Sequence, residues 1–336
     1  MVVFKNKKIL ITGCSFIGLH LLEGLISKNP QSIRVVNLTN KHFPLLERYK
    51  KDIEFHLRDL RDISSAKKSV KGMDIIFHLA SDHGGRGYVE LRQGKTASNF
   101  LLDGSVFKAC MEEGVEKIFY ASSGCVYPNY FQQNPHEKLF LKEDIVKPPY
   151  DADNIYGWGK LMGELTLKQY YKDFGLKSAI GRFFTVYGPH ASESHAVMAS
   201  IAKAFIKQDP YEVWGNGNQI RNWTYVKDIV MGILLAVEKI DDATPVNLGT
   251  QERTSVIDMI NLVNKYMGYK PKKIIFTDMP SGPKNRVADI SLARKILGWT
   301  PKYNLKSGLK KTIDWYVQNK NVDEIKQNLD KLLLHE

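Results

Sequence analysis

The chain has 336 residues, of which 43% are hydrophobic and 25% charged, as in a globular protein with one large or two moderate domains. No apolar run is long enough to cross a bilayer and the N-terminal "MVVFKNKK" lacks signal-peptide features, so we expect a cytoplasmic protein with no membrane association. The net charge of +12 would suit a nucleic-acid partner, but the lysines are scattered with no recognition motif, so we expect none.

Short β-branched runs alternate with helical stretches through the first half of the chain. Near-continuous apolar strands separated by amphipathic helices indicate a parallel sheet that is buried on both faces. We therefore expect an α/β fold, a doubly wound parallel (Rossmann) sheet of six or seven strands. The runs are "KKILIT" (7–12), "IRVVNL" (33–38), "IEFHL" (53–57), "DIIFHL" (74–79), "EKIFYAS" (116–122) and "KSAIGRF" (177–183).

The regular alternation ends after Phe184, where short Gly- and Pro-rich segments follow. We expect a Rossmann domain over residues 1–184, to which residues 222–250 return. A smaller mixed C-terminal domain, formed by residues 185–221 and 251–336, would cap the carboxyl edge of the sheet and bind substrate.

The first strand leads into "ITGCSFIG", a shortened form of the turn that binds a dinucleotide. Gly13 and Gly18 are present, but the middle glycine and one residue of the usual fingerprint are absent. The start of the following helix would still direct N–H groups at an anion. We predict that the Ser15 hydroxyl and the Phe16 and Ile17 amides hold the pyrophosphate.

The ends of the later strands provide candidates for the rest of a cofactor site. Asn37 follows the second strand, where an Asp or Glu usually receives the ribose hydroxyls, which leaves the choice between NAD and NADP open. Asp59, in "RDLRD", could accept from the adenine amino group. Small residues in "HLAS" would let a cofactor lie flat across the sheet edge. The other residues assigned to this site are Leu60, Leu79, Ala80, Ser81 and Phe183.

Three residues form the pattern with the clearest chemistry. Tyr156 and Lys160, in "YGWGK", are one helical turn apart on the same face. An ammonium beside a phenol lowers its pKa and makes it usable as a base near neutral pH. Ser123, at the end of the fifth strand, could hydrogen-bond the same substrate hydroxyl. A surface Tyr/Lys pair is the alternative, which the strand-end serine and the first turn disfavour.

These motifs resemble those of the extended short-chain dehydrogenases/reductases, in the nucleotide-sugar epimerase/dehydratase group. The resemblance covers nearly the whole chain and includes "YASSGCVYP", "GRFFTVYGP", "WGNGNQIRNWTYVKD" and "RVADISLARKILGWTP". Within the group, "DHGGRGYVE" and the cysteine two residues after the serine are most similar to the GDP-mannose 3,5-epimerases.

The resemblance implies NAD as cofactor and oxidation of a sugar at C4. Tyr156 would take the hydroxyl proton, Ser123 would orient the hydroxyl and Lys160 would bind the nicotinamide ribose. Cys125 would be one acid/base at the carbons beside the ketone. A lysine supplies the second in the relatives, and an ungapped match puts His195 at its position, either as a replacement or as a loop residue without that role. The same loop holds two further candidates, Glu193 and His190.

The resemblance also implies a site for a nucleotide-diphosphate sugar, with a GDP-sugar favoured. Arg221 and Arg286 match positions that hold the diphosphate, for which the guanidinium fork is suited. Thr185 replaces an asparagine that faces the sugar-phosphate, which puts that contact in doubt. The remaining matches are the hexose-pocket residues Gly84, Gly85 and Arg86, and Asn99 near the catalytic tyrosine.

Several functions remain open from the sequence. The first is a 3,5-epimerase acting on a GDP-hexose or GDP-heptose through a 4-keto intermediate. Others are a 4-dehydrogenase that releases the keto sugar, a UDP-sugar 4-epimerase or decarboxylase, and an inactive fold that binds RNA. The resemblance implies a homodimer, with a tetramer not excluded. The three cysteines have no metal-binding spacing, so no metal is expected.

Overall fold

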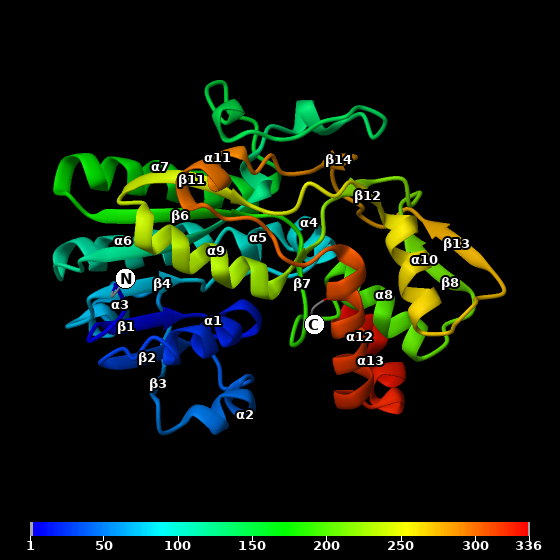
Figure 1. Cartoon of the computed structure of the whole chain (residues 1–336), viewed down its shortest axis with the longest axis horizontal. Helices are drawn as coiled ribbons and strands as arrows, with labels where there is room; N and C mark the ends of the chain where they lie inside the picture. The colour runs from blue at the N-terminus through cyan, green and yellow to red at the C-terminus, as the bar shows by residue number, and fades with distance from the viewer. Residues whose placement is uncertain (1–2, 335–336) are drawn as a thin grey trace.

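The computed structural model describes residues 3–334 and is built around a seven-stranded parallel sheet. Its order is β11-β6-β5-β4-β1-β2-β3, so the order reverses between β1 and β4 (Figure 1). The predicted doubly wound fold is confirmed, and β11 is the seventh strand. The strands are β1 (Lys8–Thr12), β2 (Ser32–Asn37), β3 (Ile53–Leu57), β4 (Ile75–His78), β5 (Lys117–Ser123), β6 (Lys177–Phe183) and β11 (Asp242–Leu248).

Both faces of the sheet are covered, which explains why its strands are apolar without alternation. In β1, Ile9 and Ile11 join the core on one face, whereas Leu10 joins the core on the other. One face packs against α1 (Phe16–Ile26) and α9 (Val226–Lys239). The helices of the other layer are α3 (Ile63–Val70), α6 (Asn99–Glu112) and α7 (Asn154–Phe174).

A second, smaller core lies beside the carboxyl edge of the sheet, to the right in Figure 1. It includes the buried side chains of Met198, Met259 and Leu309. A two-stranded parallel sheet of β8 (Tyr211–Trp214) and β13 (Ile274–Thr277) completes this part. Its helices are α8 (Ala196–Phe205), α10 (Val256–Tyr266), α12 (Leu305–Asn319) and α13 (Val322–Leu334).

One segment departs from the predicted division of the chain. Helix α11 (Ser291–Leu297) falls within the predicted substrate domain of 251–336, but it packs against α9 and β11. Ala293, Leu297 and Trp299 are part of the core of the large sheet. The chain therefore returns to the first unit twice, because α11 covers apolar surface that α9 and β11 leave open.

Shorter elements connect these two parts and shape the site between them. Helix α4 (Arg86–Leu91) follows β4, and β7 (Val186–Tyr187) follows β6. The others are α2 (Phe43–Leu46), α5 (Gln93–Thr96), β9 (Ile220–Arg221), β10 (Thr224–Tyr225), β12 (Thr254–Ser255), β14 (Asn285–Arg286) and the 3-10 turns η1 (Glu47–Tyr49), η2 (Gly124–Val126), η3 (Asn129–Gln132) and η4 (Glu143–Ile145).

Candidate active site

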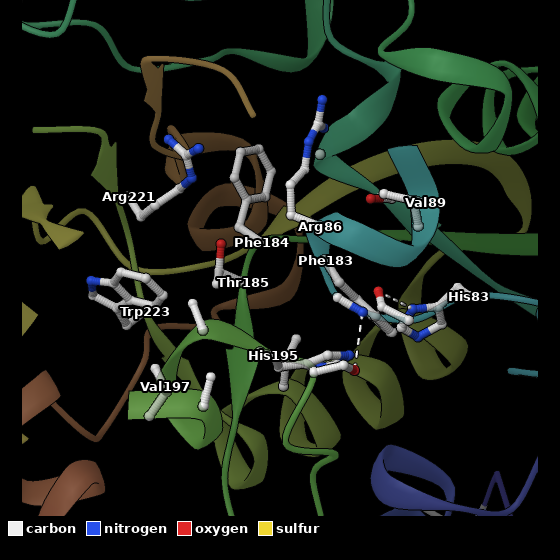
Figure 2. Close-up of a pocket in the computed structure, with 18 of the residues that line it drawn as sticks. His83, Arg86, Val89, Phe183, Phe184, Thr185, His195, Val197, Arg221 and Trp223 are labelled. Atoms are coloured by element: carbon white, nitrogen blue, oxygen red, sulfur yellow. Dashed lines mark hydrogen bonds between the residues drawn. The ribbon is translucent and has the colours of Figure 1, made fainter. Parts of the chain in front are cut away.

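A cavity of about 380 Å³ lies between the carboxyl ends of β1, β4, β5 and β6 and the smaller part of the protein. Its wall brings together residues that are far apart in the sequence (Figure 2). The predicted site residues that line it are Gly13, Ser15, Phe16, Ile17, Leu79, Ser81, Gly84, Gly85, Arg86, Ser123, Cys125, Tyr156, Lys160, Phe183, Thr185, His195, Arg221 and Arg286. Those that do not line it are Asn37, Asp59, Leu60, Ala80 and Asn99.

The turn between β1 and α1 is closed tightly by two glycines. Gly13 has φ +74°, and a Cβ there would lie 2.6 Å from the Ala80 Cα. A Cβ at Gly18 would lie 2.8 Å from the Gly13 carbonyl oxygen. Ser15 stands at the N-cap of α1 without a side-chain hydrogen bond to the helix. Its hydroxyl and the first N–H groups of α1 can therefore receive an anionic group at the cavity wall, as a dinucleotide requires.

Asn37 has a structural role in this turn that the sequence did not reveal. Its side-chain oxygen accepts from the Cys14 N–H at 2.7 Å, and its amide donates to the Cys14 carbonyl at 3.2 Å. The side chain is buried and fixes the shape of the turn, and its contact with the ribose stays a prediction. The Asp59 carboxylate pairs with Arg61 at 2.7 Å, and its contact with the adenine stays a prediction.

Asn99 makes a similar set of contacts at the end of β4. Its side-chain oxygen accepts from the Ser81 hydroxyl and the Asp82 N–H, and its amide donates to the Asp82 carbonyl. The residue therefore holds the loop that carries the cavity lining, and it lies outside the cavity. Leu60 is buried in the core under α3 and α6, and the backbone of Ala80 packs against the first turn.

Tyr156 and Lys160 lie on the cavity face of α7, as their spacing predicts. Lys160 is buried, and its Nζ lies 5.8 Å from the centroid of the Tyr156 ring. Burial raises the pKa of the Tyr156 phenol, and hydrogen bonds with Ser123 and Ser81 oppose this effect. The expected lowering of this pKa was wrong in its net direction, because the loss of solvation outweighs the groups that favour the phenolate.

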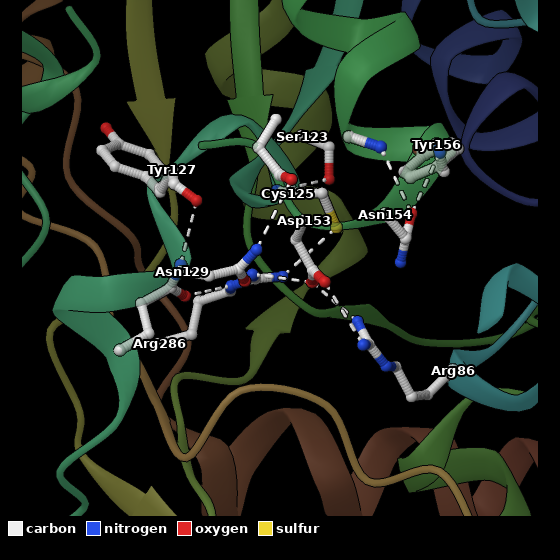
Figure 3. A network of polar contacts seen from close by, with 12 residues as sticks. Arg86, Ser123, Cys125, Tyr127, Asn129, Asp153, Asn154, Tyr156 and Arg286 are labelled. Atoms are coloured by element: carbon white, nitrogen blue, oxygen red, sulfur yellow. Dashed lines mark hydrogen bonds and ion pairs between the residues drawn. The ribbon is translucent and has the colours of Figure 1, made fainter. Parts of the chain in front are cut away.

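Cys125 lies beside two charged groups that the chain brings from distant segments. Nη1 of Arg286 donates to the Cys125 Sγ at 3.2 Å, and Nη2 donates to Asp153 at 2.9 Å. The guanidinium of Arg86 approaches the same carboxylate at 2.6 Å (Figure 3). The Cys125 N–H donates to the Ser123 Oγ at 3.1 Å, so the thiol and the predicted catalytic serine share one turn after β5.

Arg221 gives the cavity a third guanidinium. It donates to the carbonyl oxygens of Ile220 at 2.8 Å and Ser281 at 3.0 Å. Burial and repulsion by Arg286 and Arg86 lower the pKa of Arg221. Arg86 and Arg286 share the Asp153 carboxylate, and Arg86 also pairs with Glu90. Three guanidinium groups beside two carboxylates leave this wall electropositive and suited to a diphosphate.

His195 lies on another part of the wall, at the N-cap of α8, and it stacks with a histidine that the sequence analysis did not select. The rings of His195 and His83 are 5.5 Å apart, and that of His83 is 5.8 Å from Tyr156. The Gly85 N–H donates to the Ser194 Oγ at 3.1 Å, and a Cβ at Gly85 would collide with the Ser194 carbonyl. The absence of a side chain at Gly85 therefore allows the two loops to approach so closely that the rings of His83 and His195 are in contact.

The other two loop candidates are held outside the cavity. Glu193 is buried and bonds to Lys320 at 2.8 Å and to the Tyr316 hydroxyl at 3.2 Å. The His190 ring lies 4.7 Å from that of Trp315, and burial lowers the pKa of His190 to about 4. Both side chains contribute to the packing of α12, which the sequence could not show.

The end of the cavity in the smaller part has a buried lysine that was also missed. Lys203 donates to the Glu212 carbonyl at 2.7 Å, and burial lowers its pKa to about 8. The Tyr211 hydroxyl lies 2.9 Å from the Ser200 Oγ beside it. These polar groups and the Trp214 ring line the cavity on the side of the smaller part of the protein.

Thr185 lies in the cavity wall with φ +28°, a backbone conformation that a β-branched residue rarely adopts. Within residues 3–334, no group of His, Cys, Asp and Glu side chains is arranged to hold a metal ion. No helix over the same residues is long and apolar enough to cross a membrane.

Curated relatives of the chain act on nucleotide sugars by name. The chain is 35% identical over 321 residues to GDP-mannose 3,5-epimerase from Arabidopsis thaliana, which covers 93% of this chain and 82% of that protein. It is 28% identical to UDP-glucuronate 4-epimerase from Thermodesulfobacterium geofontis, over 92% of this chain and 96% of the relative.

Solved structures and a family model agree with these relatives. UDP-glucose 4-epimerase from Thermotoga maritima superposes with a TM-score of 0.81 at 25% identity, covering 93% of this chain and 99% of that one. UDP-glucuronic acid 4-epimerase from Bacillus cereus, in complex with UDP-glucuronic acid and NAD, gives 0.80 at 27% identity over 93% and 100%. Residues 9–249 match the model of the "NAD dependent epimerase/dehydratase family". The chain belongs to this family of extended short-chain dehydrogenases/reductases, and its cofactor is NAD.

Proposed function

We propose that the protein is a nucleotide-sugar epimerase that inverts carbons C3 and C5 of a GDP-mannose-type substrate, a GDP-hexose or GDP-heptose, through a 4-keto intermediate. The single observation that carries this proposal is the position of Cys125, which shares a turn with Ser123 and receives a hydrogen bond from Arg286. A 4-epimerase needs no acid/base at this position, whereas epimerisation beside the ketone does.

The first step is oxidation at C4, and the Ser–Tyr–Lys group serves it. Ser123 orients the C4 hydroxyl, and Tyr156 accepts its proton. The ammonium of Lys160, 5.8 Å from the centroid of the Tyr156 ring, would favour the phenolate against the effect of burial. When bound, NAD accepts the hydride that leaves C4 and returns it at the end, so the reaction has no net oxidation.

The second step exchanges protons at the carbons beside the ketone. A 4-keto group makes the C3 and C5 protons acidic, since each resulting carbanion is stabilised as an enolate. Cys125 and His195 come from different segments of the cavity wall, which supports their use as two acid/base groups. The His83 ring stacks with that of His195 and packs beside the Tyr156 ring. Histidine titrates near neutral pH and can replace the lysine of the relatives.

The nucleotide end of the substrate would occupy the electropositive wall. Arg221 and Arg286 would bind the diphosphate, and Arg86 would line the hexose pocket beside them. The preference for guanine rests on the similarity to GDP-mannose 3,5-epimerases from Arabidopsis thaliana and Oryza sativa. UDP-sugar epimerases are also among the relatives, so UDP-glucose and UDP-glucuronate serve as comparison substrates.

Deuterium exchange tests this function directly. The protein is incubated with GDP-mannose in deuterated water, and the recovered sugar is analysed by NMR. We expect deuterium at C3 and C5, with Cys125→Ala strongly reducing exchange while oxidation at C4 persists as transient NADH absorbance. Incorporation at neither carbon, or conversion of UDP-glucose at C4 in preference, would refute the 3,5-epimerase assignment.

The histidine at the second acid/base position supports one alternative. If His195 does not exchange protons, the enzyme would stop after oxidation and release the keto sugar as a 4-dehydrogenase. NADH would then accumulate in proportion to the product. The same incubation separates this outcome from epimerisation, in which NADH does not accumulate.

A further inference from the structure

A chain of buried polar side chains lies beneath the active site, and the proposed chemistry does not use it. Thr12, at the end of β1, lies 2.8 Å from the Nδ1 of His78, and the Nε2 of His78 lies 2.9 Å from the Asp103 carboxylate. The Tyr120 hydroxyl donates to the other oxygen of Asp103 at 2.5 Å. Asp103 is only 3% exposed, so its charge has no access to solvent.

This chain of contacts ends at Lys160. The Lys160 Nζ lies 4.7 Å from the centroid of the Tyr120 ring. The hydroxyl of Tyr120 in turn donates to Asp103. A Cβ at Gly163 would collide with the Tyr120 hydroxyl, so a glycine in α7 is needed for the helix to approach this close. Lys160 is 2% exposed, and an ammonium so buried needs a nearby negative charge.

The electrostatics agree with the geometry. Burial lowers the pKa of Lys160, and the Asp103 carboxylate opposes this effect. The pKa of Asp103 is lowered because Lys160, His78 and Tyr120 all favour its ionised form against burial. The titratable groups that face this pair are His78 from β4, Tyr120 from β5 and Tyr156 from α7.

We propose that Asp103, held by His78 and Tyr120, is the buried counter-charge of Lys160 and a positioning residue for NAD binding. The residues fix a carboxylate below the lysine, which keeps the ammonium charged at the level of the cavity. Lys160 can then donate to a ribose hydroxyl of the cofactor. This inference rests on the NAD dependence of the family and not on the proposed sugar substrate.

Calorimetric titration of the full-length protein with NAD, between pH 6.5 and 9.5, tests the proposal without a sugar. NAD binding by the wild type should weaken only at alkaline pH, where Lys160 loses its proton. Asp103→Asn removes the counter-charge, so Lys160 loses its proton at lower pH and NAD binding weakens by about tenfold for each pH unit above that point. Asp103→Glu, which keeps the charge, should retain most of the wild-type pH dependence.

Glu164→Gln is the matched control, because Glu164 is another buried carboxylate facing the sheet from α7. Its partners are Arg182 at 2.7 Å and Ser122, and not Lys160. It should lower stability without moving the pH at which NAD binding weakens. An unchanged pH dependence in Asp103→Asn, or an equal shift in Glu164→Gln, would overturn the proposal.

A thermal double-mutant cycle covers the case in which Asp103→Asn does not fold. Lys160→Met and Asp103→Asn each leave one buried charge without its partner, whereas the double variant leaves none. The Tm loss of the double variant should therefore be smaller than the sum of the two single losses. Additive losses, or a double variant that folds no better than Asp103→Asn, would show that the two charges are not coupled.

Discussion

At the scale of single residues, the cavity contains a positively charged side chain whose surroundings disfavour its charge. Arg221 is half-buried near two other guanidinium groups, and loss of solvation together with repulsion by Arg286 and Arg86 lowers its pKa. Its hydrogen bonds go to carbonyl oxygens, which do not neutralise it. A guanidinium without a neighbouring carboxylate of its own favours binding of an anion, because the ligand then supplies the missing negative charge.

We predict that Arg221→Met weakens GDP binding by about tenfold to a hundredfold, the range for loss of a charged hydrogen bond. Thermal unfolding with and without GDP measures it, since a ligand at about 100-fold above its Kd stabilises the native state by about 2.7 kcal/mol. Arg253→Met is the control, because Arg253 also donates to a carbonyl, that of Leu139, and does not line the cavity. A full GDP shift in Arg221→Met would exclude Arg221 from diphosphate binding.

The buried ammonium of Lys203 leads to a prediction about how the stability of the protein depends on pH. Burial lowers its pKa to about 8 in the folded state, whereas 10.5 is ordinary for the unfolded chain. Between these values the unfolded state binds more protons, so this residue makes stability rise with pH. The unfolding free energy of wild type minus that of Lys203→Met should increase by on the order of 3 kcal/mol from pH 8 to 10.5.

Urea unfolding of both proteins at several pH values measures this difference. Because the other titrating groups are the same in both proteins, their effects cancel. The difference should be flat between pH 6 and 7, where Lys203 is protonated in both states. A difference that falls with rising pH would show that the folded state stabilises the Lys203 ammonium.

At the scale of elements, the β1–α1 turn depends on a residue from the neighbouring strand. Asn37 both accepts from and donates to the Cys14 backbone, whereas an ionised carboxylate can only accept. Asn37→Asp would place a carboxylate oxygen against the Cys14 carbonyl. We predict a loss of about 1–3 kcal/mol in unfolding free energy and weaker NAD binding, although aspartate is the residue usual at this position.

Chemical denaturation and NAD titration measure both effects, with Asn40→Asp as the control on the exposed loop after β2. Unchanged stability with tighter NAD binding would mean that residue 37 serves the ribose and not the turn.

The same turn shows what a sequence can and cannot predict. The six strands were predicted because burial on both faces leaves long apolar runs that few other structures produce. Tyr156 and Lys160 followed from their local spacing, whereas the arginines of the cavity were assigned from the resemblance to a family. The turn contacts of Asn37 and the contacts of His83 and Asp103 were missed because their partners come from other segments, and nothing local records such contacts.

At the scale of the whole molecule, the cavity lies between two hydrophobic cores, and the chain passes from one core to the other more than once. Arg286, in β14, reaches the cavity just before the chain returns to the large sheet through α11. Arg221, in β9, and His195, at the N-cap of α8, come from the smaller part, whereas Tyr156, in α7, and Cys125, in η2, come from the larger. Substrate binding would therefore stabilise the contact between the two parts as well as each part separately.

The outer surface of α6 and α7 suggests how two copies assemble. Leu101 is 64% exposed and Met162 45% exposed, and Phe100 and Trp158 add further apolar surface. A Cβ at Gly159 would lie 3.7 Å from the Asn99 Cβ, so the N-terminal turns of both helices lie side by side. Exposed apolar side chains on two adjoining helices are typical of an interface.

We predict a homodimer in which α6 and α7 pair with the same helices of a second copy as a four-helix bundle, a two-fold arrangement that buries this surface in both. Leu101→Lys with Met162→Lys should halve the mass measured by light scattering after size exclusion, because two buried cations would face each other across the axis. Phe276→Lys, at an exposed position in β13, should leave the mass unchanged. A dimer that persists in the double variant would place the interface on another surface.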